Sequence, residues 1–400
     1  MKLRHIKTGC FVLEGLNSFA TAFFFNYLFF YMQQQFAFDR KHNLLLSALN
    51  GFVYMFAAWF GGRFAQKHGY FFALRLGFAI MALSLALGSQ MTSPQGVMAA
   101  MVGWTLGMCF TWPTLEALVS EGESREGLAR MVGIYNIVWA TTAALAFFFG
   151  GALFERLGPK SLFWLPVILH LVQLELATWL KQKATSLTGL DPAIRPEPQP
   201  VEKTRSTHSV AEAKSFLRMA WIANPFAYIA ISALIPLIPD LALRLGLSPT
   251  LAGFFCSIFF FARLGTFAWL WQWSGWHYHF GWLVGAYLAL IGSFAAILLI
   301  PKLWVIVLAQ ILFGLAIGLI YYSSLFYSMD AGDTKGEHGG LHEAAIGTGI
   351  FAGPATGAIA IHWLPSHPNS SIWAVTLLLL AGFTAMVITR ARTRPSANSG

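Results

Sequence analysis

Residues 181–216 read KQKATSLTGL DPAIRPEPQP VEKTRSTHSV AEAKSF, the one long polar interruption in an otherwise apolar chain. This stretch carries four prolines and six Lys or Arg residues, with almost no large apolar side chain. Proline and charge without a buriable face are typical of a solvated linker. Six hydrophobic segments lie on either side of it. The stretch therefore divides the chain into two halves, residues 1–180 and 217–400.

The composition decides the class of protein. Apolar residues make up 56% of the 400 residues and charged residues 11%, against roughly 25% charged in a typical soluble domain. Mean hydropathy is +0.60, so we expect most of this surface to be covered by lipid. The net charge of +9 does not indicate nucleic acid, because no basic patch interleaved with aromatics lies outside the segment flanks.

Each hydrophobic segment is long enough to cross a bilayer, since about 20 helical residues span the hydrocarbon layer. Only helices satisfy their own backbone hydrogen bonds there. The sequence therefore predicts an all-α polytopic membrane protein with twelve transmembrane helices in two six-helix bundles. The segments fall near 9–33, 43–61, 70–90, 96–119, 131–154, 161–180, 217–240, 250–273, 281–300, 303–328, 343–363 and 371–389.

The distribution of basic residues predicts the orientation. With both termini in the cytoplasm, 19 of the 26 Lys and Arg residues lie on the cytoplasmic side, six lie outside and Arg263 lies within a segment. An excess of this kind is the positive-inside pattern.

The two halves also repeat weakly. An offset of 211 residues carries Gly103-x3-Gly107 in the fourth segment onto Gly314-x3-Gly318 in the tenth. Such pairs are common in membrane helices because they let backbones approach closely. Together with six segments in each half, however, the repeat favours a transporter architecture.

The loop between the second and third segments carries a family motif. From Gly62 to Phe71 it reads GRFAQKHGYF, which resembles the motif G-x-x-x-D-[RK]-x-G-[RK]-[RK] of the major facilitator superfamily. Gly62, Lys67 and Gly69 match, whereas Gln66 replaces the acidic residue and aromatics replace the final basic pair. The family's acidic charge relay is therefore not implied for this chain.

A second family motif is displaced along the chain. Gly340, Gly349, Gly353, Pro354 and Gly357 fit G-x8-G-x3-G-P-x2-G, which lies in the fifth segment of the family's antiporters and in the eleventh here. Small residues and a proline on one face permit close packing and a kink. We therefore interpret the motif as a hinge and packing element rather than as evidence for antiport.

The resemblance covers essentially the whole chain and implies a major facilitator fold. It implies cytoplasmic termini and central loop, and a cavity that opens alternately to each side, lined by segments one, four, seven and ten. It also implies a multi-pass protein of the bacterial inner membrane that binds a small-molecule solute. We expect a monomer without a cofactor.

Arg263 is the clearest candidate for solute binding. It lies close to the middle of the eighth segment, where a charged side chain is expensive. Its guanidinium must therefore find a carboxylate, a carbonyl or an anionic substrate. Substrate binding and a structural bond to helix-end carbonyls both remain open.

Glu14, Asn17 and Thr21 form one stripe on the first segment, at spacings of three and four residues. In the family's architecture this stripe faces the cavity. Glu14 is a candidate for proton coupling, because partial burial raises the pKa of a carboxyl group towards working pH. A salt bridge or a helix-end bond near the cytoplasmic face is the alternative.

Several uncharged polar side chains suit an organic ligand with hydroxyl, amide or ring groups. In the tenth segment Gln310 and Tyr321 share a stripe with Gly314 and Gly318, predicted to face the opposite bundle. Such groups also join helices to one another, which is their commoner role. The further candidates are Tyr54 on the second segment and Asn136 on the fifth.

The histidines suggest a weak alternative function. His338, His342 and Glu343 lie close together in sequence, but they do not form H-E-x-x-H, and we expect no metal. No phosphate-binding loop or nucleophile elbow occurs, so we expect no enzyme activity. The sequence predicts a secondary transporter of a small organic solute, coupled to protons. The alternatives are a solute sensor that does not transport and a membrane-embedded metal enzyme.

Overall fold

The described part of the chain is helical throughout. The computed structural model describes residues 3–123, 125–188, 210–331 and 335–393. The first half contains α1 (Leu3–Phe36), α2 (Arg40–His68), α3 (Tyr70–Gly88), α4 (Pro94–Met108), α5 (Trp112–Ser120), α6 (Arg125–Leu157) and α7 (Ser161–Thr188). The second contains α8 (Val210–Leu234), η1 (Ile235–Leu237), α9 (Ile238–Arg244), α10 (Pro249–Cys256), α11 (Ile258–Gln272), α12 (Phe280–Leu299), α13 (Leu303–Ala331), α14 (Lys335–Trp363) and α15 (Ser370–Thr393).

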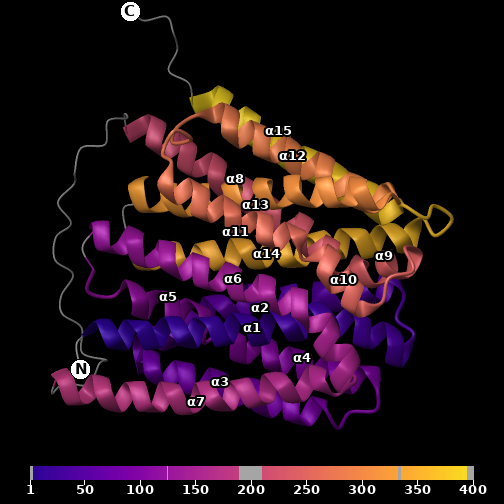
Figure 1. Ribbon diagram of the computed structural model, residues 1–400. Helices are drawn as coiled ribbons and strands as arrows, with labels where there is room; N and C mark the ends of the chain where they lie inside the picture. The colour runs from indigo at the N-terminus through magenta and orange to yellow at the C-terminus, as the bar shows by residue number, and fades with distance from the viewer. Residues whose placement is uncertain (1–2, 124, 189–209, 332–334, 394–400) are drawn as a thin grey trace, which may run out of the picture.

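The helices run roughly side by side in two bundles (Figure 1). The first bundle, α1–α7, lies below the second, α8–α15, with α2 and α6 next to α14 and α11 at the boundary. We call the end where α1 begins and α15 ends the terminal face. The opposite end, with the α1–α2 and α14–α15 loops, is the distal face.

Eleven helical stretches among the described residues are long and apolar enough to cross a membrane. The predicted fourth span is interrupted, because α4 has 15 residues and α5 has nine. Pro113 has no backbone N–H to bond the Cys109 carbonyl four residues earlier, so the helix opens there. A Cβ on Gly61 of α2 would lie 2.2 Å from the Cys109 carbonyl oxygen, so α2 packs directly against the opening.

The helices extend further into the polar stretch than the sequence predicts. α7 continues to Thr188 and α8 begins at Val210, so 181–188 and 210–216 are helical rather than linker. Lys, Gln, Ala and Glu are good helix formers, and the end of a membrane helix continues into water when such residues follow it. Residues 189–209 lie outside the described ranges. Likewise α14 begins at Lys335, before the predicted start at 343.

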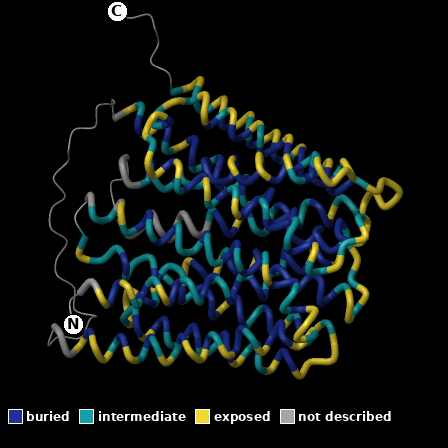
Figure 2. Tube along the Cα trace, in the orientation of Figure 1, coloured by how far each residue is buried: buried dark blue, intermediate teal, exposed yellow. Residues whose placement is uncertain are grey.

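Apolar side chains cover the outside of the bundles. Trp304, Leu83 and Leu377 are each more than 60% exposed. Figure 2 shows exposed residues along the outer edges and buried residues between the helices. A water-soluble protein rarely exposes so much contiguous apolar surface, whereas in a bilayer these side chains face lipid.

The bundles meet most closely through two glycines. A Cβ on Gly51 of α2 would lie 2.4 Å from the backbone of Ile350 and Phe351 in α14. A Cβ on Gly151 of α6 would lie 2.1 Å from the Pro249 carbonyl oxygen of α10. Only glycine permits these approaches, so each bundle touches the other backbone to backbone.

Candidate functional site

Glu14 is fully buried in α1 and is held by two hydroxyl groups. Ser18 Oγ, one turn along the same helix, donates to its Oε1 at 2.5 Å. Tyr135 OH of α6 donates to its Oε2 at 3.0 Å. Among the described residues, no cationic side chain forms an ion pair with this carboxyl group. The described residues therefore do not form the salt bridge considered as an alternative for Glu14, and Glu14 joins α1 to α6 through neutral donors.

Asn17 reaches the opening between α4 and α5. Its Nδ2 donates to Thr111 Oγ1 at 3.1 Å, and Thr111 Oγ1 itself donates to the Met108 carbonyl at 2.8 Å. Thr21, by contrast, bonds the Asn17 carbonyl of its own helix at 2.8 Å. The predicted stripe on α1 thus divides into a contact to α6, a contact to the α4–α5 opening and an internal bond.

Arg263 lies at the boundary between the bundles. Its side chain on α11 is 5% exposed, and its guanidinium carbon lies 4.4 Å from the ring centre of Trp139 in α6. The ring of Phe260, one turn earlier on α11, lies at 5.1 Å. Nε has no hydrogen-bond partner in the described ranges. These ring contacts are cation–π interactions, and one of the two rings comes from the opposite bundle.

Tyr321 of α13 completes a group of rings around Arg263. Its ring stacks on Trp139 at 5.7 Å between centroids. It also lies 5.6 Å from Phe267 of α11 and 6.3 Å from Tyr228 of α8. We call Trp139, Tyr228, Phe260, Phe267 and Tyr321 the aromatic cluster. It joins four helices from both halves of the chain, and two of its rings, Trp139 and Phe260, contact the guanidinium.

Three other predicted residues lie elsewhere. Tyr54 is buried against Trp112 of α5, with ring centroids 6.3 Å apart. Asn136 donates through Nδ2 to the Val132 carbonyl of its own helix at 2.8 Å. Gln310 is buried, and neither polar atom of its amide has a partner within the described residues. Tyr54 and Asn136 therefore contribute to packing within the first bundle rather than to the aromatic cluster.

The glycines of α13 do not face the opposite bundle, which corrects the sequence prediction. A Cβ on Gly314 would lie 2.4 Å from the Phe259 carbonyl oxygen. A Cβ on Gly318 would lie 2.6 Å from Thr266 Cβ. Both neighbours belong to α11 of the same bundle, so these glycines let α13 and α11 pack closely. Tyr321, further along the same helix, does reach the bundle boundary, where it stacks on Trp139.

At the loop motif, the glycine that packs closely against a neighbouring helix is the one before Gly62. A Cβ on Gly62 would meet only Pro113, at 3.8 Å, whereas the neighbouring Gly61 packs tightly against α4. Lys67 is exposed at the end of α2, and Gly69 has a positive φ of 95° where α3 begins. Gly69 therefore supplies the turn between the two helices, because a side chain disfavours that backbone conformation.

The α14 motif packs against α8. A Cβ on Gly349 would lie 2.3 Å from the Pro225 carbonyl oxygen, and one on Gly353 would lie 2.3 Å from that of Ile229. Pro354 lies inside the helix. Gly357 has more room, with the nearest Leu44 carbon 3.2 Å from a Cβ. Gly349 and Gly353 bring α14 against α8 within the second bundle, and α14 is also the helix that meets α2.

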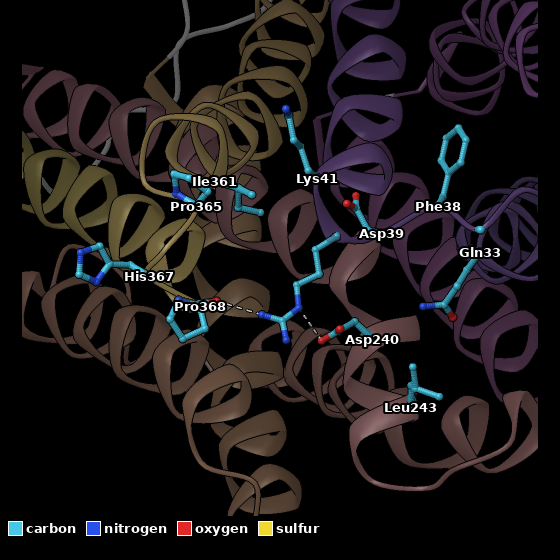
Figure 3. A pocket seen from close by; sticks show the side chains of 12 residues that line it. Gln33, Phe38, Asp39, Lys41, Asp240, Leu243, Ile361, Pro365, His367 and Pro368 are labelled. Atoms are coloured by element: carbon cyan, nitrogen blue, oxygen red, sulfur yellow. Dashed lines mark hydrogen bonds and ion pairs between the residues drawn. The ribbon is translucent and has the colours of Figure 1, made fainter.

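Polar contacts join the bundles at the distal face. Arg40 Nε pairs with Asp240 Oδ2 at 2.8 Å, and Arg40 Nη1 donates to the Pro368 carbonyl at 3.0 Å. Asp240 also accepts from Arg244 Nε at 3.0 Å. Arg40, Asp240 and Pro368 line a pocket of about 440 Å³ that also includes Gln33 and other residues of the α14–α15 loop (Figure 3). In this conformation the two bundles are therefore in contact at the distal face, which we describe as a joined distal face.

A metal site is not formed by the described side chains, which contain no cluster of three His, Cys, Asp or Glu. The side chains of His338, His342 and Glu343 lie outside the described ranges, so the structure does not bear on the predicted metal-enzyme alternative.

Ser18, Thr111, Tyr135 and Trp139 are among the contacting residues that were not sequence candidates. Ser18 follows Glu14 by four residues, and Trp139 follows Tyr135 by four, so each pair shares a helix face. The four-residue spacing is visible in the sequence and indicates that Ser18 lies beside Glu14. Tyr135 therefore touches Glu14 on the same face of α6 from which Trp139 touches Arg263.

The whole chain matches solved transporters in fold. It is similar to a POT peptide transporter in complex with alafosfalin, at TM-score 0.72 and 15% identity, covering 98% of this chain and 99% of that one. It is similar to a bacterial homologue of the human lysosomal transporter Spinster, at TM-score 0.70 and 15% identity, covering 99% of each chain. It is also similar to the nucleoside transporter NupG, at TM-score 0.67 and 13% identity, covering 98% and 100%. No curated sequence matches.

Two helical bundles with this arrangement define a polytopic transporter fold. The family model of the Major Facilitator Superfamily matches residues 10–354. The chain belongs to that superfamily, which confirms the resemblance and the fold class predicted from the loop motif and the spans.

Proposed function

We propose that this protein is a proton-coupled secondary transporter of a small organic solute, working by alternating access in a bacterial cell membrane. The distal face is extracellular in this proposal, because the basic residues concentrate at the terminal face. Membership of a transporter family supports transport. Glu14 supports proton coupling, and the aromatic cluster with Arg263 supports a solute site at the bundle boundary.

The observation that carries proton coupling is the environment of Glu14. A carboxyl group without a nearby cation is costly to ionise inside a membrane. Ser18 and Tyr135 donate to it when it is ionised, and the protonated form has its own O–H to donate. The group can therefore exist in both protonation states without rearranging its helix, as a proton carrier requires.

The position of Tyr135 links this carboxyl group to the solute site. Tyr135 and Trp139 lie on one face of α6, and Trp139 contacts Arg263 and Tyr321 of the other bundle. A change in the hydrogen bond between Glu14 and Tyr135 therefore acts on the helix that contacts the solute site. Coupling of this kind needs a differential interaction in the two states of the transporter.

Solute flux in liposomes tests the proposal. Purified protein in liposomes with an imposed pH gradient should drive accumulation of a solute found by thermal-shift screening, because a ligand that binds the folded state raises its stability. Glu14→Gln should abolish gradient-driven accumulation while retaining exchange of the same solute between the two sides. Glu175→Gln provides the matched control, because Glu175 is an exposed carboxylate on α7.

The outcomes are distinct. Equal gradient-driven accumulation in Glu14→Gln and wild type would contradict proton coupling through Glu14. Binding of solutes without any flux would contradict transport and favour a sensor.

A further inference from the structure

The positive charge of Arg263 is not neutralised by any side chain that the structure describes. Among the residues that the structure describes, it forms neither an ion pair nor a hydrogen bond through Nε. The neighbouring aromatic cluster contributes two phenol groups, Tyr228 and Tyr321, and no carboxylate. Glu14, the buried carboxylate described above in the first bundle, accepts hydrogen bonds from Ser18 and Tyr135 instead.

We propose that Arg263 binds the negative group of the transported solute, and that this solute is a small organic anion with a flat ring or conjugated system. This inference rests on the transport function proposed above and names the substrate class for the same site. Arg263 is 5% exposed, and its charge needs a partner of opposite sign, because a buried cation left unpaired is strongly unfavourable.

The two rings against Arg263 leave the in-plane N–H groups of its guanidinium available for an anion. Trp139 and Phe260 lie against the guanidinium at 4.4 and 5.1 Å from its carbon. Cation–π contact satisfies the face of a guanidinium, whereas its N–H groups point outward in its plane. A carboxylate in that plane accepts two parallel N–H bonds from Arg. The two cation–π contacts are therefore compatible with a bidentate anion in the plane of the guanidinium, and they do not neutralise its charge.

The aromatic cluster favours a flat solute. Tyr321 stacks on Trp139 with an angle of 27° between the rings, and Phe267 and Tyr228 lie beside it. Flat rings stack favourably on such side chains in offset or edge-on geometry. A solute whose carboxylate meets Arg263 would place its ring among these residues.

The site also belongs to both bundles. Trp139 comes from α6 of the first bundle and Arg263 from α11 of the second. Movement of one bundle against the other changes this contact, so the affinity for the anion differs between conformations. A difference of this kind is what allows a bound solute to bias the transport equilibrium.

Pairs of acids and their amides test the inference directly. Binding of benzoate and benzamide, and of indole-3-acetate and indole-3-acetamide, is measured at pH 7.5 on purified full-length protein by thermal shift. At least one carboxylate should bind saturably, and its amide should bind at least tenfold more weakly. Arg263→Gln should lower the carboxylate affinity at least tenfold. Arg63→Gln should leave it unchanged, since Arg63 stacks on Trp59 at 4.0 Å on an exposed part of α2.

Each contrary result has one meaning. Amides that bind as tightly as acids, no binding by any of the acids, or equal binding to Arg263→Gln and wild type would overturn the inference. If Arg263→Gln does not fold, Trp139→Leu replaces it, with the same tenfold loss expected and an unchanged affinity overturning the inference. Flux of a neutral solute that Arg263→Gln leaves unchanged would overturn the anion site but not the transport function. Carboxylate binding without flux would overturn transport but not the anion site.

Discussion

The contact between Gly51 and α14 allows a quantitative prediction about alternating access. In Gly51→Ala the new Cβ would lie 2.4 Å from the backbone of Ile350 and Phe351, where ordinary contact begins at 3.4 Å. The two helices must therefore separate by about 1 Å, and overpacking of this kind costs typically about 1–3 kcal/mol. If only the conformation with the distal face joined carries this cost, the ratio of the two conformations shifts by about 5- to 150-fold.

Cysteine labelling measures that shift. Ser47 is fully buried at the bundle boundary, where its Oγ donates to the Ser232 carbonyl at 3.2 Å. A membrane-impermeant maleimide added from the distal side should label Ser47→Cys faster when Gly51 is Ala. On the terminal half, Gly133 of α6 is buried next to Trp271 of α11, so Gly133→Cys should not be labelled faster from its own side, because the terminal face closes as the distal face opens. The three native cysteines are buried.

Two results would refute this reasoning. Faster labelling at both Ser47→Cys and Gly133→Cys would mean a general loosening of the boundary rather than movement of one bundle against the other. The same change produced by Gly292→Ala would also refute it, because a Cβ at Gly292 in α12 meets nothing within 4 Å.

Three further predictions concern the distal face and the helix packing. Asp240→Asn should shift the equilibrium away from the joined distal face by up to about fivefold, because its bridge to Arg40 is partly exposed and such pairs contribute about 0.2–1 kcal/mol; distal labelling measures it. Asp39→Ala should cost about 1 kcal/mol of stability at neutral pH, as expected for loss of an N-cap, since Asp39 accepts from the His42 amide at 2.9 Å. Burial raises the pKa of Asp39, but hydrogen bonds and the charge of His42 outweigh it, so the pKa falls below its ordinary value of 3.8. The Asp39 contribution is therefore present above pH 3.8 and lost as pH falls through the lower folded pKa, and thermal melts across pH measure it. Gly353→Ala should destabilise the protein by about 1–3 kcal/mol, because its Cβ would meet the α8 backbone, and thermal melts in detergent measure this.

Controls follow from the same geometry. Gly357→Ala should destabilise less than Gly353→Ala, because Leu44 can move; equal losses would contradict the packing argument. High salt should reduce the effect of Asp240→Asn, since it screens the wild-type bridge. A difference between Asp39→Ala and wild type that persists unchanged well below pH 3.8 would contradict the capping argument.

The sequence predicted the class and most of the spans, because hydropathy acts locally. The interruption after Cys109 could not be placed from hydropathy, which stays high across it. Pro113 frees the carbonyl, but the opening is stabilised by groups of other helices, Asn17 and Gly61. The loop motif matches Gly62, whereas the neighbouring Gly61 is the glycine that packs against α4, because helix rotation decides which of the two faces that helix.

The candidate site was predicted only in part. Arg263 and Glu14 stood out because charges inside a span are expensive. Their contacts, Trp139 and Tyr135, lie more than 100 residues away in sequence. Tertiary packing alone brings them together, so no local pattern could have identified the pairs.

The isolated guanidinium of Arg263 has an electrical consequence. A charge held in the middle of a bilayer lies within the transmembrane voltage, and moving one elementary charge across the whole field changes the energy by about 2.3 kcal/mol per 100 mV. Any shift of Arg263 along the membrane normal would therefore make the empty carrier sensitive to the resting potential. An anion that travels with Arg263 would cancel that charge, so the loaded carrier would cross the same field almost unaffected.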